Sequence, residues 1–180
     1  MKTEFKAKFL QHVAKKRKEE GFTLIELLVV IIIIGILSAI ALPSFLNQAN
    51  KAKQSEAKQY LASINKGQQA YYAENGTFVI GPIQDNIGQL GLGIKTATGN
   101  YTYNISAATQ QVGATADELG VAAWTDETAT GLRGYAAIVY LTDADGALTS
   151  QTIICEGEVG LSDEPTYNSE CVGSGYETPL

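Results

Sequence analysis

A run of twenty uncharged residues from Leu27 to Leu46, LLVVIIIIGILSAIALPSFL, dominates the hydrophobic pattern of the chain. At 1.5 Å per residue, a helix of this length spans about 30 Å, the thickness of a hydrocarbon core. A core helix of a soluble protein seldom shows four consecutive isoleucines without a polar face. The run therefore predicts a membrane-spanning helix.

The helical periodicity continues beyond Pro43, but with one apolar face. That stripe consists of residues at i, i+4, i+7 and i+14 with a tyrosine beside them: Ala57, Leu61, Ile64, Tyr71 and Tyr60. The other faces carry Lys51, Lys53, Gln54, Lys58 and Lys66. Asn75-Gly76 is a typical helix stop. One helix from Thr23 to about Asn75 is expected, and its exposed apolar half must be covered by lipid or by copies of itself.

Gly35 and Pro43 interrupt the apolar half of this helix. Proline removes one helical hydrogen bond and its ring clashes with the preceding turn, so a kink or local opening is expected there. Membrane helices often tolerate such breaks. The alternative is that residues 35–43 form a compliant stretch that lets copies of this helix pack together and their assembly extend.

Alternating strand-like segments follow in the second half of the chain. The expected strands are Tyr101–Ile105, Val121–Thr125, Tyr135–Leu141 and Leu148–Cys155, the last two joined across residues 142–146. The pattern predicts an antiparallel sheet packed on the polar half of the helix, which is an α+β head. Tyr60, Tyr71 and Tyr72 are expected to pack between helix and sheet.

The net charge of −6 divides into two opposite parts. Residues 1–21 carry seven Lys/Arg and three Glu, whereas residues 22–180 carry six Lys/Arg and sixteen Asp/Glu. The basic cluster at residues 15–18 is expected to stay in the cytoplasm, with everything after Leu46 delivered outside it. The one histidine, His12, lies in the basic part. A Ser-His-Asp triad, a Cys-His dyad or a histidine-ligated metal is therefore not expected in the body of the protein.

Two processing schemes fit a basic segment followed by an apolar one. A signal peptide would be cut after Ala41, in the A-x-A sequence of residues 39–41, and would release a soluble protein. Pro43 close behind the cut and the acidic Glu26 before the apolar run disfavour this scheme. The second scheme cuts between Gly21 and Phe22 and keeps the apolar segment in the mature protein.

Residues 21–26 read Gly-Phe-Thr-Leu-Ile-Glu. In these residues the sequence resembles the type IV pilins, a family that includes the pseudopilins. The resemblance implies that a membrane peptidase cuts after Gly21 and methylates the new amine of Phe22. It is close from Gly21 to about Tyr72, and beyond that it is architectural. The 21-residue leader resembles in length that of cyanobacterial-type major pilins.

Glu26 corresponds to the buried glutamate of that family. A carboxylate in a membrane segment costs about 2–3 kcal/mol or more, so a partner is expected. The Phe22 ammonium formed by cleavage is the nearest cation, because the next one downstream is Lys51. The hypothesis is that the Phe22 ammonium of an incoming subunit neutralises Glu26 of its neighbour and sets the axial register. The alternative is a solvated Glu26 at the headgroup boundary.

Cys155 and Cys171 are expected to form a disulfide, because no second cysteine pair or histidine completes a zinc site. The resemblance places this bonded loop at the C-terminal edge of the head. The acidic residues in it are expected to form a solvated face, with a calcium site as the alternative: Glu156, Glu158, Asp163, Glu164 and Glu170. Residues 143–146 read as a hairpin turn, because an EF-hand in that register would lack its first and last ligands. Asn75, Asn100 and Asn104 begin glycosylation sequons by spacing.

The expected organisation has three parts: a cleaved basic leader (1–21), a transmembrane and filament-core helix (22–50) and a globular head (51–180). The head comprises an amphipathic helix (51–75), a variable loop (76–132) and the antiparallel sheet with the disulfide loop (133–180). The resemblance implies a structural subunit without catalytic activity, metal or cofactor. It would be a single-pass inner-membrane precursor with its C-terminus outside the cytoplasm, and then part of a surface pilus for motility, adhesion and DNA uptake.

The implied partners are copies of the chain, the prepilin peptidase, the assembly platform, minor pilins and the cytoplasmic membrane, without direct binding of nucleic acid. A pseudopilin of a type II secretion system shares every feature through Pro43 and is the closest rival. The Cys pair and the large head favour a pilin. A minor pilin and a secreted domain cleaved after Ala41 are two further interpretations of the sequence. The mature N-terminus separates the secreted domain from a pilin.

Overall fold

The computed structural model describes residues 21–112, 119–165, 171 and 175–180. The expected leader, apart from Gly21, and the basic cluster within it lie outside these residues. The chain divides into two compact units, one ending at Leu46 and one beginning at Asn47. Each unit is described below by itself.

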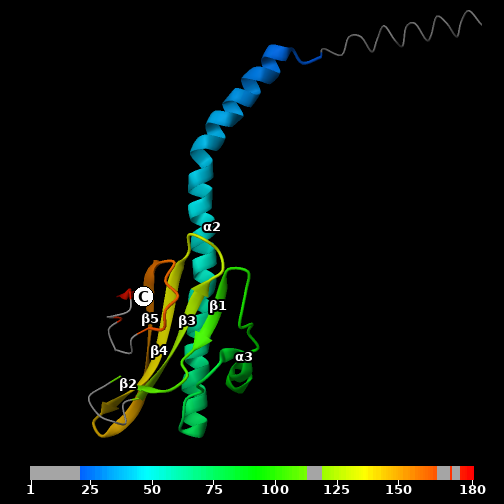
Figure 1. Ribbon diagram of the computed structural model, residues 1–180. Coiled ribbons are helices and arrows are strands. Elements are labelled where there is room, and N and C mark those ends of the chain that lie inside the picture. Colours follow the sequence, from blue (N-terminus) through cyan, green and yellow to red (C-terminus); the bar gives the residue numbers. More distant parts are fainter. Residues whose placement is uncertain (1–20, 113–118, 166–170, 172–174) are drawn as a thin grey trace, which may run out of the picture. The chain divides into compact units, whose positions relative to one another are not determined.

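Helix α2 comprises Leu24–Asn75, which confirms the predicted helix to within one residue at its start (Figure 1). Both Gly35 and Pro43 lie inside it, and the chain stays helical on either side of each. The proline still lacks an N–H for the carbonyl of Ala39. The role of residues 35–43 as a break in an assembled fibre stays a prediction. The helix ends as expected, because Gly76 takes a φ of 70° and donates its N–H to the carbonyl of Tyr72.

The head contains an antiparallel sheet with the strand order β1-β3-β4-β5-β6, and β2 pairs with β3 as well. Its strands among the described residues are β1 (Tyr101–Ile105), β2 (Gln110–Gln111), β3 (Leu119–Glu127), β4 (Arg133–Ala144), β5 (Ala147–Val159) and β6 (Tyr176–Pro179). A short helix α3 (Ile83–Asn86) and a 3-10 turn η1 (Ile87–Leu90) precede the sheet. The predicted α+β architecture, a long helix on an antiparallel sheet, is confirmed.

The four predicted strands all form, and three of them extend beyond the predicted bounds. Strand β4 continues to Ala144 and β5 begins at Ala147, so the connection is a two-residue turn of Asp145 and Gly146. Both residues have positive φ, 55° and 85°, as a tight hairpin turn requires. The predicted hairpin at residues 143–146 is therefore confirmed, and it is tighter than predicted.

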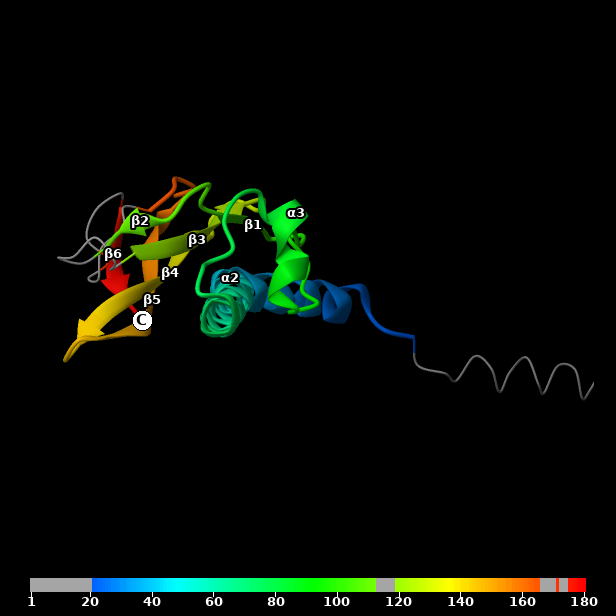
Figure 2. The same ribbon diagram turned by 90° about the horizontal axis from the view of Figure 1, so that it is seen from below.

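The predicted apolar stripe of α2 packs on the sheet. Ala57, Leu61 and Ile64 are buried, and Tyr60 and Tyr71 are partly buried against the same core. Viewed along the second half of α2, the strands lie on one side of the helix, with α3 beside it (Figure 2). From the sheet the core receives Tyr101, Tyr103, Tyr135, Val139 and Leu141. Burial of these large side chains at about 25 cal/mol per Å² joins this part of the helix to the head.

Two polar contacts add specificity to this packing. The side-chain amide of Gln68, which is buried, donates to the carbonyl of Val79 at 2.7 Å and accepts the Val79 N–H at 2.9 Å. Gln69 donates to the carbonyl of Ser150 in β5 at 3.2 Å. Because the Gln68 amide satisfies both backbone groups of Val79, the chain leaving α2 is fixed against the helix.

Candidate functional site

The segment from Gly21 to Glu26 is where the chain passes from a non-helical backbone into α2. Gly21 and Phe22 are outside the helix, and the Phe22 side chain is exposed. Thr23 caps the helix, because its Oγ1 accepts the N–H of Glu26 at 3.2 Å. In return the Glu26 carboxylate accepts the Thr23 N–H at 2.9 Å and the Thr23 hydroxyl at 2.7 Å. These reciprocal bonds form a capping box, which fixes the start of the helix just after the Gly21–Phe22 peptide bond.

The two carboxylate oxygens of Glu26 differ in the hydrogen bonds that they accept. Both Thr23 donors bond Oε2. Within the described residues no hydrogen bond or ion pair reaches Oε1. The carboxylate is thus held in one orientation by its own chain while one oxygen stays available to a further donor.

The apolar half of α2 exposes its side chains all round the helix. None of residues 21–48 is buried, and the exposed large side chains include Ile25, Leu28, Ile32, Ile36, Ile40 and Phe45. This helix is long and apolar enough to cross a membrane. Side chains of this kind need lipid or other apolar helices around them.

The prediction that the acidic residues of the disulfide loop form a solvated face is wrong for Glu156. It lies in β5 and forms ion pairs with Lys58 of α2 at 3.4 Å and with Arg133 of β4 at 3.3 Å. The Tyr135 hydroxyl also donates to it at 3.4 Å, and the Lys58 ammonium lies 5.1 Å from the centroid of the Tyr135 ring. The sheet register places β4 beside β5, so three elements meet at this carboxylate. Glu158 and Asp163 are exposed as predicted, and Glu170 lies outside the described residues.

The disulfide joins Cys155 of β5 to Cys171, with the two Cα atoms 5.6 Å apart. Both cysteines are buried against Ala136 and Tyr176, with Trp124 and Leu161 partly buried beside them. This cluster is separate from the core under α2. The bond closes the predicted C-terminal loop, and β6 follows it and pairs with the end of β5.

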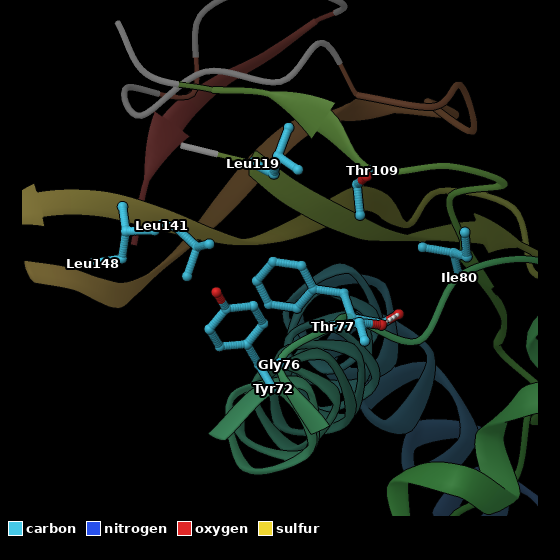
Figure 3. Close-up of a pocket in the computed structure, with 9 residues that line it drawn as sticks. Tyr72, Gly76, Thr77, Ile80, Thr109, Leu119, Leu141 and Leu148 are labelled. Atoms are coloured by element: carbon cyan, nitrogen blue, oxygen red, sulfur yellow. Dashed lines mark hydrogen bonds between the residues drawn. The ribbon is translucent and has the colours of Figure 1, made fainter. Parts of the chain in front are cut away.

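A cavity of about 310 Å³ opens at the C-terminal end of α2 (Figure 3). It is lined by Tyr72, Gly76, Thr77, Phe78, Ile80, Thr109, Leu119, Leu141 and Leu148. The Tyr72 ring stacks on Phe78 with centroids 4.7 Å apart. Among the described residues, the lining of this cavity is apolar apart from hydroxyl groups and contains no carboxylate, imidazole or thiol.

The residues of the predicted hairpin turn and of the glycosylation sequons form hydrogen bonds within the head. The Asp143 carboxylate accepts the N–H of Gly146 at 2.7 Å within the hairpin turn. Two of the three sequon asparagines donate to carboxylates, Asn100 to Glu56 at 2.8 Å and Asn104 to Asp126 at 2.9 Å. Asn75, at the end of α2, is exposed. Among the described residues, no group of three or more His, Cys, Asp or Glu side chains could hold a metal ion.

Sequence reasoning missed two residues of this arrangement. The Thr-x-x-Glu spacing before an apolar run is a capping-box pattern, so Thr23 could have been found from sequence. Gln68 could not, because its partner is the backbone of a residue eleven positions away.

Comparison with known proteins agrees with the geometry. A family model described as Type IV pilin-like G and H matches residues 54–173, and the Prokaryotic N-terminal methylation motif matches residues 16–42. The type IV major pilin protein PilA of Myxococcus xanthus is 37% identical over 91 residues, which cover 51% of this chain and 39% of that protein. The Type IV wide pilus major component PilA4 of Thermus thermophilus is 35% identical over 92 residues, covering 51% of this chain and 67% of that protein.

Type II secretion proteins match over a shorter stretch. The core protein G of Aeromonas hydrophila is 33% identical over 64 residues, which cover 36% of this chain and 45% of that protein. No solved structure matches the chain.

The matched part of the chain spans less than half of the length of the Myxococcus and Aeromonas relatives and two thirds of the length of the Thermus relative. Because the first family model covers most of the chain, from the polar half of α2 through strand β5, the chain belongs to the type IV pilin-like family.

Proposed function

We propose that this chain is a structural subunit of a type IV pilus, which polymerises through the apolar half of α2. The observation that carries the proposal is a helix that exposes apolar side chains all round, directly after the Gly-Phe-Thr-Leu-Ile-Glu segment. Such a helix is stable in lipid, and it leaves lipid at little cost only when other apolar helices replace the acyl chains. A bundle of identical helices meets that requirement.

The precursor would be held in the cytoplasmic membrane by α2, with the head outside the cytoplasm. A prepilin peptidase would cut between Gly21 and Phe22 and methylate Phe22. The non-helical backbone and the exposure of these two residues support the assignment, since proteolysis requires an accessible, non-helical peptide bond. Mass spectrometry of the natural N-terminus tests it: N-methylated Phe22 is expected, and a mature protein beginning at Leu42 would contradict it.

Assembly would pair the Phe22 ammonium of an incoming subunit with Glu26 of its neighbour. Pairing neutralises the charge of a carboxylate that would otherwise lie among apolar helices without a cation. Replacing Glu26 with Ala should leave the subunit in the membrane and abolish fibres. Normal fibre yield from that variant, measured on material sheared from cells, would exclude this pairing.

A second candidate function is that of a pseudopilin in a type II secretion system, favoured by the similarity to core protein G. Electron microscopy of sheared surface fibres, with mass spectrometry of their subunit, separates the two. Long surface fibres built from this chain support the pilus. Loss of protein secretion on deletion, without surface fibres, supports the pseudopilin.

As a pilus subunit the chain would act mechanically and not catalytically. The proposed roles are surface motility, attachment and support of DNA uptake, with the assembly platform and minor pilins as partners. The head is acidic in sequence, which disfavours binding to nucleic acid, so contact with DNA would fall to other pilus components.

A further inference from the structure

We propose that the cavity at the C-terminal end of α2 is a docking surface for a second copy of this chain, and that it receives Val159 of that copy with Lys51 and Lys53 around it. The inference rests on the proposed function, which supplies the second copy. It adds a contact between heads to the packing of the apolar helices.

The cavity combines exposed apolar side chains with an acidic rim. Leu148 of β5 and Ile80 line it and are 43% and 39% exposed, although both side chains are large and apolar. Exposed apolar side chains that gather around one cavity are typical of a protein contact. Glu74 of α2 and Asp145 of the hairpin turn flank the lining in sequence, and both are exposed. An occupant should therefore be apolar where it enters and basic around that point.

A fibre of identical subunits that all point the same way has heterologous contacts between its heads. In such a contact one surface of a copy meets a different surface of the next copy, and the contact repeats along the fibre. The partner of the cavity is therefore expected on another part of the same head, with the complementary chemistry.

The end of the head where α2 enters has that chemistry. Lys51 is exposed and Lys53 is partly exposed, and among the described residues neither forms an ion pair. Val159, the last residue of β5, is 58% exposed. This end thus offers an exposed apolar side chain and two positive charges to an acidic, apolar cavity.

Contacts within the head hold these residues at one end of it. The side-chain amide of Asn50 donates to the carbonyl of Gly131 at 3.4 Å. The N–H of Gly160, which follows Val159, donates to the carbonyl of Leu132 at 3.2 Å. Because Gly131 and Leu132 are consecutive, the end of β5 lies near the point where α2 enters. Figure 1 shows the β4–β5 hairpin and the C-terminal end of α2 at the opposite end of the head.

Strand β5 carries the two apolar side chains of the proposed contact near its opposite ends. Leu148 is the second residue of the strand and Val159 is the last. At about 3.3 Å per residue they lie about 35 Å apart. Val159 therefore cannot enter the cavity of its own head, and the occupant must come from another copy.

The first experiment tests the contact in sheared fibres. Leu148→Cys and Val159→Cys are introduced together into the full-length precursor, which is expressed in the natural host in place of the unaltered chain. The fibres are treated with a short bismaleimide, which joins the new thiols and does not react with the Cys155–Cys171 disulfide. The double variant should give a ladder of covalently joined subunits. Each single variant should give no product, and fibres of the two single variants mixed should give only dimers.

Two outcomes would overturn the contact while the proposed function stands. One is fibres of the double variant that give no ladder. The other is cross-linking of Val159→Cys to itself, because the entry end would then meet a second entry end. Absence of fibres from the unaltered chain would overturn the inference and the proposed function together.

The second experiment measures fibre yield without new cysteines. Val159→Asp should be inserted and cleaved normally, as measured by alkaline extraction and mass spectrometry, while fibre yield falls about tenfold or more, because an unpaired charge would be buried in the cavity. Leu180→Asp is the matched control, since Leu180 is 57% exposed and lies at neither end of β5. It should leave the yield unchanged. Equal yields of the two variants would overturn the contact.

A charge exchange tests the acidic rim. Lys51→Glu should lower fibre yield about two- to fivefold, the factor expected for one exposed ion pair. Glu74→Lys in the same chain should restore the yield, because the two charges are exchanged and not lost. A further fall in yield on adding Glu74→Lys would overturn the charge pairing between the two ends of the head.

Discussion

Tyr60 of α2 lies on Tyr103 of β1 with ring centroids 4.9 Å apart and ring planes inclined by 11°. This stack joins the helix to the first strand, and it places the Tyr103 ring in the core with no exposed surface. The Tyr103 hydroxyl is also buried, and within the described residues it has no hydrogen-bond partner. A buried hydroxyl without a partner lowers stability, because its bonds to water are not replaced.

Tyr103→Phe should therefore raise the free energy of unfolding of the head, by about 1 kcal/mol, because the ring stack is kept and the unsatisfied hydroxyl is removed. Urea denaturation of the detergent-solubilised subunit, followed by the fluorescence of Trp124, measures it. Tyr101→Phe is the matched control. Tyr101 is equally buried, but its hydroxyl donates to the carbonyl of Arg133 at 3.0 Å, so the same change there should lower stability. Equal effects of the two changes would contradict this reasoning.

Gln68→Leu should destabilise the head by about 2–3 kcal/mol, because it leaves both the N–H and the carbonyl of Val79 buried without partners. Hydrogen exchange should also show faster exchange of the Val79 amide. Gln69→Leu is the control, since Gln69 donates to Ser150 from a partly exposed position. If Gln69→Leu lowers the stability of the head as much as Gln68→Leu does, the hydrogen bonds to Val79 are not the cause of the loss.

Glu156→Gln should lower the stability of the head by about 1 kcal/mol, because the carboxylate is shared by Lys58 and Arg133 in a partly exposed site. Raising the salt concentration should reduce the difference between the variant and the unaltered chain. Glu158→Gln changes a neighbouring exposed carboxylate and should have no measurable effect. If Glu158→Gln costs as much, the loss reflects net charge and not the ion pairs.

Alkaline pH should destabilise the head through its buried tyrosines. Burial raises the pKa of Tyr101, Tyr103, Tyr135 and Tyr176 well above the ordinary value of about 10. Above pH ~10 the unfolded chain releases these protons while the folded chain retains them, so the unfolded state binds fewer protons and stability falls as pH rises. Below pH ~10 this contribution is fully present.

Tyrosinate absorbance measured together with unfolding checks the alkaline effect. The four buried tyrosines should ionise only as the head unfolds, and later than the partly buried Tyr60, Tyr71, Tyr72 and Tyr140. Ionisation of all nine tyrosines in one early step, with the head still folded, would contradict the burial of these hydroxyls.

Much of the fold could be predicted because its signals are local. The uncharged run, the apolar stripe with Leu61 and Ile64, and the Asn75-Gly76 stop determine α2, and alternation determines the central strands. The short elements α3, η1, β2 and β6 were not predicted, because two to four residues carry too little periodicity. Their formation depends on pairing with elements that are already in place.

The assignment of Glu156 to a solvated face was wrong for a similar reason. Its place between the cysteines suggested an exposed loop, but β5 continues past Cys155 to Val159. Its cationic partners come from α2 and β4, and only the register of the sheet brings them together. The roles of Gly21, Phe22 and Glu26 in processing and assembly stay predictions that depend on the cell's machinery.

The hairpin turn at Asp145 and Gly146 offers a practical consequence. Residues 143–149 are exposed, and the turn is closed by the Ala144–Ala147 pair. Lengthening such a connection by a few residues costs little closure entropy, since that cost grows only with the logarithm of loop length. A short epitope inserted between Asp145 and Gly146 should thus be displayed by the head without altering its fold. The subunit would then be a carrier for foreign peptides.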